Sequence, residues 1–401
     1  MPAKDPTLRI ALIGFAGLAV AIGIGRFAFT PLLPMMLADG VVTIPGGGLL
    51  TTAHFVGYLM GALTAARVPM SPRALLPASL IAIGLATLAM GLTGEFWLWL
   101  ALRWIAGVAS AWVLVLVGTH CVNALAEQGR PDRQGWVFSG VGAGVALAGL
   151  GCFAMMAFSV ANEAAWLVFG AVALLIAAAL WTKLGPEVPA ARPSRSAPVA
   201  ERTPIAWTVV VVYGAAGLGY IVPGTYLPAM AREIVPSPLI FGWGWPVFGA
   251  AAFLSTLASA ALHRRFSNRR IWSVSQVVMG AGLPLPVLFP HILSIVAAGL
   301  CVGGTFMVIT MAGLREAHRI AGSTDAVRHV VAMTAAFATG QTIGPVFAGA
   351  LYDATASFAP SLIATSIFLI ATAALLEQSN PLTCFFRKGR AATIRNTNRG
   401  M

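Results

Sequence analysis

The sequence contains little charge. Asp, Glu, Lys and Arg make up 9% of its 401 residues, whereas apolar residues make up 58%; a soluble domain has about 25% charged residues. So few charges could not solvate a globular surface. The alternating ten-residue strands of a membrane barrel are also absent, so the backbone in a bilayer must satisfy its hydrogen bonds within helices. The composition excludes an ordinary soluble domain and predicts an all-α membrane protein.

Other absences narrow the chemistry. The four cysteines, Cys121, Cys152, Cys301 and Cys384, lack metal-type spacing, and we expect unpaired thiols. No Gly-x4-Gly-Lys-Ser/Thr sequence is present, which excludes direct ATP-driven chemistry by this chain. We find neither clustered acids for a metal nor a nucleophile beside a base. The sequence therefore predicts no enzyme activity, no metal and no cofactor.

Long apolar blocks occupy most of the chain. Each is about 20 residues long, which is the length that crosses a hydrocarbon core of roughly 30 Å. Lys4 and Arg9 precede the first block as in a signal sequence, but no small-residue cleavage site follows, so we expect this block to remain as a helix. The twelve predicted spans are residues 9–37, 47–66, 74–93, 97–120, 135–158, 164–182, 205–229, 239–262, 271–289, 292–314, 330–350 and 358–376.

The positive charges test this count. Nearly all of the 25 Lys and Arg residues fall on the side of the N-terminus when the spans are threaded in order. Arg232 is the only one in a loop on the opposite side, while Arg26 and Arg103 lie within spans. This bias predicts that both termini are cytoplasmic. The net charge of +12 then belongs to short loops that face anionic lipid, and we expect no nucleic-acid partner.

The chain restarts near its middle. The string GIGRFAFTPLLPMM of residues 23–36 returns in reduced form as GLGYIVPGTYLPAM in residues 217–230, at a constant offset that aligns Arg26 with Tyr220. A second glycine pattern in residues 140–149 returns in residues 340–349. Such parallel repeats occur in secondary transporters. The predicted units are an N-terminal six-helix bundle (1–183), a proline-rich cytoplasmic linker (184–204), a C-terminal six-helix bundle (205–378) and a basic cytoplasmic tail (379–401).

Several strings resemble the major facilitator superfamily. The segment LRWIAGVASA of residues 102–111 is similar to its span-four motif, and HRRFSNRR of residues 263–270 is similar to its basic loop between spans eight and nine. The counterpart GALTAAR of residues 61–67 lacks the usual aspartate. Residues 23–36, 57–63 and 340–353 resemble the bacterial YbfB/YjiJ-type group. The resemblance implies twelve helices in two pseudo-symmetric bundles and a transporter in the bacterial cell inner membrane, without naming a substrate.

Arg26 is the leading candidate for substrate binding. An arginine inside a span costs at least roughly 2.5–3.5 kcal/mol, so it should face a cavity or the bundle interior. Its planar guanidinium suits a carboxylate or phosphate. Prolines nearby and in the repeat lack a backbone donor and are predicted helix breaks, at Pro31, Pro34, Pro223 and Pro228. The alternative is that Arg26 donates to carbonyls freed by these prolines and only fixes the kink.

Arg103, in the fourth span, is the second cationic candidate. With Arg26 it could form a joint anion site, or it could extend outward to the membrane surface. No Asp or Glu is predicted in the middle of any span, and two buried arginines without an acid are costly unless an anion visits. The sequence therefore favours an anionic substrate over a cationic one.

The same lack of acids leaves His54 as the candidate for proton coupling, because only histidine has an unperturbed pKa between 5 and 8. The alternative is a hydrogen-bonded histidine of the core. The further substrate-binding candidates are Tyr58, Tyr220, Tyr226, Gln276 and Gln341, for each of which ordinary interhelical hydrogen bonding is the alternative. Tyr220 leads this group because it is the repeat mate of Arg26.

These observations favour a secondary transporter that moves a small, anionic organic solute by alternating access, as a monomer and with export slightly ahead of import. The alternative is broad-specificity efflux of lipophilic drugs. The expected partners are the solute, membrane lipid and, if His54 carries it, a coupling proton.

Overall fold

A computed structural model describes residues 5–65, 68, 70–182, 204–235, 237 and 242–378. Within these ranges the secondary structure is helical and contains no strand, as predicted. The predicted linker and tail lie outside the described residues, except for Pro204. Among the described residues, eleven helical segments are long and apolar enough to cross a membrane.

The first half of the chain contains eight α-helices and three short segments of other helix type. Their bounds are α1 Pro6–Leu18, η1 Ala19–Ile24, α2 Phe29–Ala38, α3 Ile44–Thr64, α4 Pro72–Met90, α5 Phe96–Leu116, η2 Val117–Cys121, α6 Val122–Glu127, η3 Pro131–Arg133, α7 Gln134–Ala157 and α8 Asn162–Trp181. The second predicted span corresponds to α3, which is not among the eleven most apolar helices. Its glycines, threonines and His54 lower its hydropathy.

The second half is also helical. Its helices are α9 Trp207–Ile234, α11 Gly244–Arg265, α12 Asn268–Gly282, α13 Leu285–Leu288, α14 Ile292–Thr355 and α15 Ala359–Gln378. The tenth and eleventh predicted spans both belong to α14, whose membrane-length parts are Ile292–Ala321 and Arg328–Thr355. The inner loop predicted between them is helical instead.

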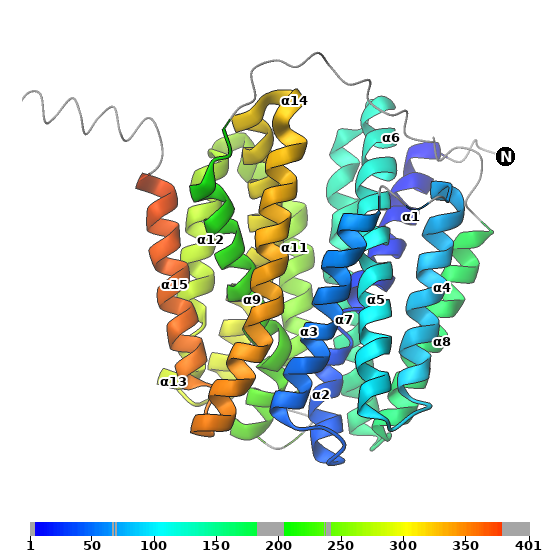
Figure 1. Cartoon of the computed structure of the whole chain (residues 1–401), viewed down its shortest axis with the longest axis vertical. Coiled ribbons are helices and arrows are strands. Elements are labelled where there is room, and N and C mark those ends of the chain that lie inside the picture. Colours follow the sequence, from blue (N-terminus) through cyan, green and yellow to red (C-terminus); the bar gives the residue numbers. More distant parts are fainter. Residues whose placement is uncertain are drawn as a thin grey trace, which may run out of the picture.

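The two halves lie side by side (Figure 1). The N-terminus and the end of α15 are at the same end of the molecule, while the junction of α2 and α3 is at the opposite end. Across the interface α7 packs against α11, α3 packs against α14, and α2 packs against α9. Of these pairs, α2 and α9 hold equivalent places in the two repeats, whereas α7 meets the equivalent of α3 and α3 meets the equivalent of α7.

Glycines bring several of these helices into backbone contact. A Cβ atom at Gly142 of α7 would lie 2.2 Å from the Phe253 nitrogen of α11, and one at Gly249 of α11 would lie 2.2 Å from the Ala146 nitrogen. Gly144 faces the first span instead, where its Cβ would lie 2.4 Å from the Ala19 carbonyl oxygen. The glycine repeat of α7 therefore serves both the contact between halves and the packing of its own half.

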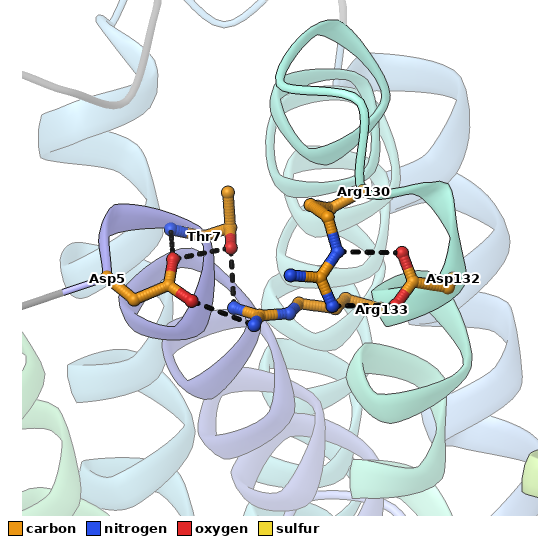
Figure 2. Close-up of polar contacts among 5 residues, drawn as sticks. All are labelled: Asp5, Thr7, Arg130, Asp132 and Arg133. Atoms are coloured by element: carbon orange, nitrogen blue, oxygen red, sulfur yellow. Dashed lines mark hydrogen bonds and ion pairs between the residues drawn. The ribbon is translucent and has the colours of Figure 1, made fainter.

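A polar cluster at the N-terminal end ties α1 to α7 (Figure 2). Asp5 caps α1 by accepting from the Thr7 amide at 3.0 Å, and its other carboxylate oxygen lies 2.8 Å from Arg133 Nη2. Hydrogen bonds from Thr7 and Arg133 lower the pKa of Asp5 to about 2. Arg130 forms a separate bidentate pair with Asp132, at 3.0 and 2.9 Å.

Candidate functional site

The first span is interrupted where Arg26 lies. The α-helical pattern of α1 widens into the π-helical segment η1, and a turn over residues 25–27 separates η1 from α2. At Gly23 the first span packs directly against the backbone of α7, where a Cβ atom would lie 2.4 Å from Gly144 Cα. Because glycine has no Cβ, the two helices can approach this closely. Single π-turns of this kind occur frequently at functional sites.

The prolines do not all break helices as predicted. The interruption in the first half precedes Pro31, which lies in the first turn of α2, while Pro34 is inside that helix. In the second half α9 continues through Pro223 and Pro228, so the predicted breaks there are wrong. Proline is tolerated near a helix start because the first amides lack intrahelical partners, which explains the position of Pro31.

Arg103 supports the interruption from α5. Its Nη1 donates to the Gly25 carbonyl at 2.9 Å and its Nη2 donates to the Arg26 carbonyl at 3.2 Å. Seven residues later on the same helix face, Ser110 donates to the Ala21 carbonyl at 2.8 Å. Arg103 is buried, so the alternative in which it extends outward is wrong. The capping of freed carbonyls that we considered for Arg26 is performed by Arg103.

Arg26 is left with aromatic neighbours. Its Nη2 donates to the Tyr220 hydroxyl across the interface between halves. Its Cζ lies 4.5 Å from the ring centre of Phe55, 5.1 Å from that of Phe27 and 5.3 Å from that of Tyr58. Among the described residues no carboxylate pairs with Arg26, and its Nε has no hydrogen-bond partner. The guanidinium is buried and charged without an acid.

Tyr220 is fixed by its neighbours in the second half. Its ring stacks on Phe306 at 5.2 Å and 11°, and on Phe337 at 5.5 Å and 15°. Its hydroxyl also accepts a hydrogen bond from Gln341 Nε2. The Oε1 atom of the same Gln341 amide has no hydrogen-bond partner. The structure therefore brings together Arg26, Tyr58, Tyr220 and Gln341 from three helices and the interruption of the first span.

Two other candidates are occupied elsewhere. Tyr226 donates to the Pro345 carbonyl at 2.9 Å, and its ring packs against Phe358 at 5.2 Å. Gln276 accepts from Trp272 and donates to Thr372, both at 2.8 Å. Gln276 thus makes the interhelical hydrogen bonds that were its alternative interpretation.

His54 is fully buried on α3. Neither ring nitrogen has a hydrogen bond of normal geometry, although the backbone of Arg103 lies close to the ring. Both Arg103 and Arg26 are within electrostatic reach of the imidazole.

Five hydrogen bonds join the halves at the interruption of the first span, at α2 and at the first half of α3. Besides the pair Arg26–Tyr220, Thr30 Oγ1 donates to the Gly224 carbonyl at 2.6 Å and Thr52 Oγ1 donates to the Thr342 carbonyl at 2.9 Å. The others are Arg232 to the Pro34 carbonyl at 2.7 Å and Tyr226 to the Ile44 carbonyl at 3.4 Å. These contacts join the halves on the side of the α2–α3 junction.

On the opposite, N-terminal side an acidic residue pairs with the basic loop. Glu316 of α14 lies 2.5 Å from Arg269 and 2.7 Å from Arg319, so the basic loop predicted from residues 263–270 is anchored by an acid. Within the described ranges no group of three metal-ligating side chains was found. Neither arrangement supplies a carboxylate to Arg26.

Sequence reasoning missed the aromatic cluster, by which we mean Phe27, Tyr220, Trp245, Phe248, Phe306 and Phe337. Ring centres of Phe27 and Trp245 are 5.7 Å apart, and those of Phe248 and Phe306 are 5.6 Å apart. Phe27 follows Arg26 directly and could have been noticed. The other members come from α9, α11 and the two parts of α14 without a shared motif, so only the fold brings them together.

Comparison with known proteins gives a family. Residues 18–377 match the family described as uncharacterised MFS-type transporter YbfB. Uncharacterized MFS-type transporters of Yersinia pestis (strain Pestoides F) and of Yersinia pseudotuberculosis (serotype O:1b, strain IP 31758) are 28% identical over 137 residues. This match spans 34% of the present chain and 34% of each of these curated relatives.

Solved structures share the fold at low identity. A bacterial homologue of the human lysosomal transporter Spinster, in an inward-facing and occupied conformation, superposes with a TM-score of 0.71 at 15% identity, over 93% of this chain and 97% of that one. The D-xylose–proton symporter gives 0.76 at 12%, and the nucleoside transporter NupG gives 0.71 at 11%, each over 93% of this chain and 98% of the other. These likenesses confirm the predicted fold of two pseudo-symmetric helical bundles.

Proposed function

The chain belongs to the YbfB-type family of the major facilitator superfamily and is a secondary transporter rather than an enzyme, and from this premise we propose that it carries a small organic anion by alternating access. The carrier works as a monomer in the bacterial inner membrane, with both termini in the cytoplasm and export as its direction.

The observation that carries this proposal is the unpaired charge of Arg26. The side chain is 8% exposed, and aromatic rings and one hydroxyl are the contacts described for its guanidinium. A buried charge without a counterion is strongly unfavourable. An anion bound to Arg26 would supply the missing charge and would use the free Nε donor. A cationic substrate would instead need a carboxylate.

The contacts between the halves support alternating access. Five hydrogen bonds join the halves on the side of α2. Opening the molecule on the α2 side requires these bonds to break. Since one of them is the bond from Arg26 to Tyr220, an anion that takes the guanidinium from Tyr220 would weaken this closure.

A proton is the coupling ion that this site would favour. His54 lies near the positive charges of Arg26 and Arg103, and Tyr58 is on the same helix. In the described part of the site no acidic side chain pairs with His54. Adding a proton to His54 is therefore favoured once an anion has bound, and anion and proton bind cooperatively by linkage. Substitution of His54 by Gln should abolish proton accumulation that is driven by an anion gradient while leaving Arg26-dependent anion binding.

Broad efflux of lipophilic drugs is the second candidate, because the aromatic cluster beside Arg26 could accept uncharged apolar ligands. Such binding would not need the arginine.

A thermal-shift screen of the purified protein in detergent separates the two. Ligands are sorted into carboxylates, phosphates, neutral compounds and cations, and each is tested on the wild type and on Arg26→Ala. The proposal expects stabilisation by a set of anions that disappears in the variant. Stabilisation by neutral or cationic lipophiles alone, equal in both proteins, would favour drug efflux and leave Arg26 as a structural residue.

A further inference from the structure

The side chains beside Arg26 are predominantly aromatic. On the first-half side the guanidinium lies within 5.3 Å of the ring centres of Phe27, Phe55 and Tyr58. On the opposite side the ring of Tyr220 lies 5.6 Å from it. Cation–π attraction helps to hold the charge out of water, but rings supply no hydrogen-bond acceptor for the Nε donor.

The aromatic surface extends away from Arg26 into the second half. Tyr220, Phe306 and Phe337 form a parallel stack, and Trp245 stacks on Phe248 at 4.5 Å and 14°. Phe27 joins the two groups, since its ring centre is 6.4 Å from that of Tyr220 and 5.7 Å from that of Trp245. Flat faces in this orientation are suited to another flat ring, whereas an aliphatic ligand would gain nothing from their alignment.

Three polar atoms near these rings have no partner. They are Nε of Arg26, Oε1 of Gln341 and Nε1 of Trp245, all of them buried. Gln341 shares the Tyr220 hydroxyl with Arg26, and Trp245 neighbours Phe27, so the three atoms border one aromatic cluster. Buried polar atoms are rarely left unpaired, and a ligand that binds between them is one of the ordinary explanations.

The number of these polar atoms limits the ligand. A sugar carries a hydroxyl on nearly every carbon and would need many more partners than Arg26, Tyr220, Gln341 and Trp245 offer. A carboxylate can take Nε and Nη2 of Arg26 as a fork after the Tyr220 hydroxyl moves aside. One polar ring substituent could then pair with the Gln341 amide.

We propose that the solute of this carrier is a small aromatic carboxylate, with its carboxylate on Arg26 and its ring among Tyr220, Phe306 and Phe337. This inference rests on the proposed anion transport and adds the class of anion. The stacked rings select the flat body of the ligand, and Arg26 selects its charge.

Four probes of related size test both parts on the purified wild-type protein. They are benzoate, cyclohexanecarboxylate (the same charge without a flat ring), benzamide (the ring without the charge) and propionate (a small aliphatic acid). Binding is measured by calorimetry and by thermal shift. We expect benzoate to bind about three- to tenfold more tightly than cyclohexanecarboxylate, because stacking of aromatic rings contributes about this much to affinity. We expect benzamide to bind far more weakly than benzoate.

Two variants test whether the aromatic cluster causes the preference for benzoate. Phe337→Leu keeps apolar volume but removes one face of the stack, and it should erase the preference for benzoate over cyclohexanecarboxylate. Phe289→Leu, at a phenylalanine that is 63% exposed, is the matched control and should keep the preference. If Phe337→Leu does not fold, the comparison of the four probes on the wild type still decides the question.

The outcomes separate this inference from the function on which it rests. Equal binding of benzoate and cyclohexanecarboxylate, lost in both cases in Arg26→Ala, would overturn the aromatic class and leave anion transport standing. Equal binding of benzoate and benzamide, unchanged in Arg26→Ala, would overturn both.

Discussion

The guanidinium of Arg26 donates a hydrogen bond to the hydroxyl of Tyr220, the residue that holds the same position in the second repeat. Thr30 and Gly224 are related in the same way, and they too are hydrogen-bonded, at 2.6 Å. Repeat mates therefore meet across the axis that relates the halves. The single difference between arginine and tyrosine turns a symmetric contact into a donor–acceptor pair, and it leaves a cation on one half only.

Replacement of Arg26 by alanine should reduce solute transport at least about tenfold, since hydrogen bonds to charged groups contribute about 1.5–3 kcal/mol. Arg26→Lys should restore little, because an ammonium cannot form the fork that a carboxylate prefers. Uptake into proteoliposomes measures the effect. Arg130→Ala, at an exposed arginine of the N-terminal cluster, is the control and should transport normally. Normal transport by Arg26→Ala would refute the site.

Tyr220→Phe keeps the ring stack on Phe306 and Phe337. It removes the hydroxyl that accepts a hydrogen bond from Arg26 while the halves are joined on the α2 side. We expect anion binding to become tighter by several-fold, because the ligand no longer competes with the hydroxyl. Opening on the α2 side should become more frequent. Calorimetry measures the first effect, and accessibility of cysteines introduced at the α2–α3 junction measures the second. Weaker binding would mean that the hydroxyl is a ligand contact instead of a competitor.

Arg103 should act as a positioning residue. In Arg103→Ala the carbonyls of Gly25 and Arg26 lose their donors, so the protein should lose thermal stability and the Michaelis constant should rise. Arg103→Lys has a single ammonium nitrogen in place of the two guanidinium nitrogens that reach separate carbonyls, and it should recover stability only in part. The test compares Arg103→Ala with Arg26→Ala. Only the first should change stability clearly in the absence of solute, and the opposite order would exchange the assigned roles.

The sequence predicted the helical class, the spans and the repeat because hydropathy and glycine spacing are local signals. It also selected Arg26, Tyr220 and Gln341, which the fold brings together. It could not predict that Arg103 turns inward to the Gly25 carbonyl, because the path of a side chain depends on the neighbouring helix. It placed breaks at Pro223 and Pro228, where packing keeps α9 helical. The sequence did not show that Trp245, Phe248, Phe306 and Phe337 join Phe27 and Tyr220 in one cluster, because these residues come from distant parts of the chain.

The hydrogen bonds that Asp5 accepts from Thr7 and Arg133 should make stability sensitive to acid. The folded pKa of Asp5 is lowered from 3.8 to about 2, so the contribution is complete above pH 3.8 and disappears as the pH falls toward 2. Asp5→Asn should melt at a slightly lower temperature than the wild type at neutral pH. The difference should shrink between pH 4 and 2 in detergent thermal melts. A difference that stays constant with pH would mean that the charge of Asp5 does not contribute to stability.

The contact of Gly23 with Gly144 should tolerate no side chain. A Cβ at Gly23 would lie 2.4 Å from Gly144 Cα and 2.5 Å from its carbonyl carbon, and neither backbone atom can rotate away. Gly23→Ala must therefore separate the first span from α7, at a cost of about 1–3 kcal/mol. Because Arg26 is three residues away, the shift should also lower solute affinity. Gly118→Ala is the matched control, since its Cβ would meet nothing within 4 Å and alanine favours a helix. Thermal melts and calorimetry on both variants make the comparison. If Gly23→Ala were as stable as Gly118→Ala and bound solute normally, the packing against α7 would not be what positions Arg26.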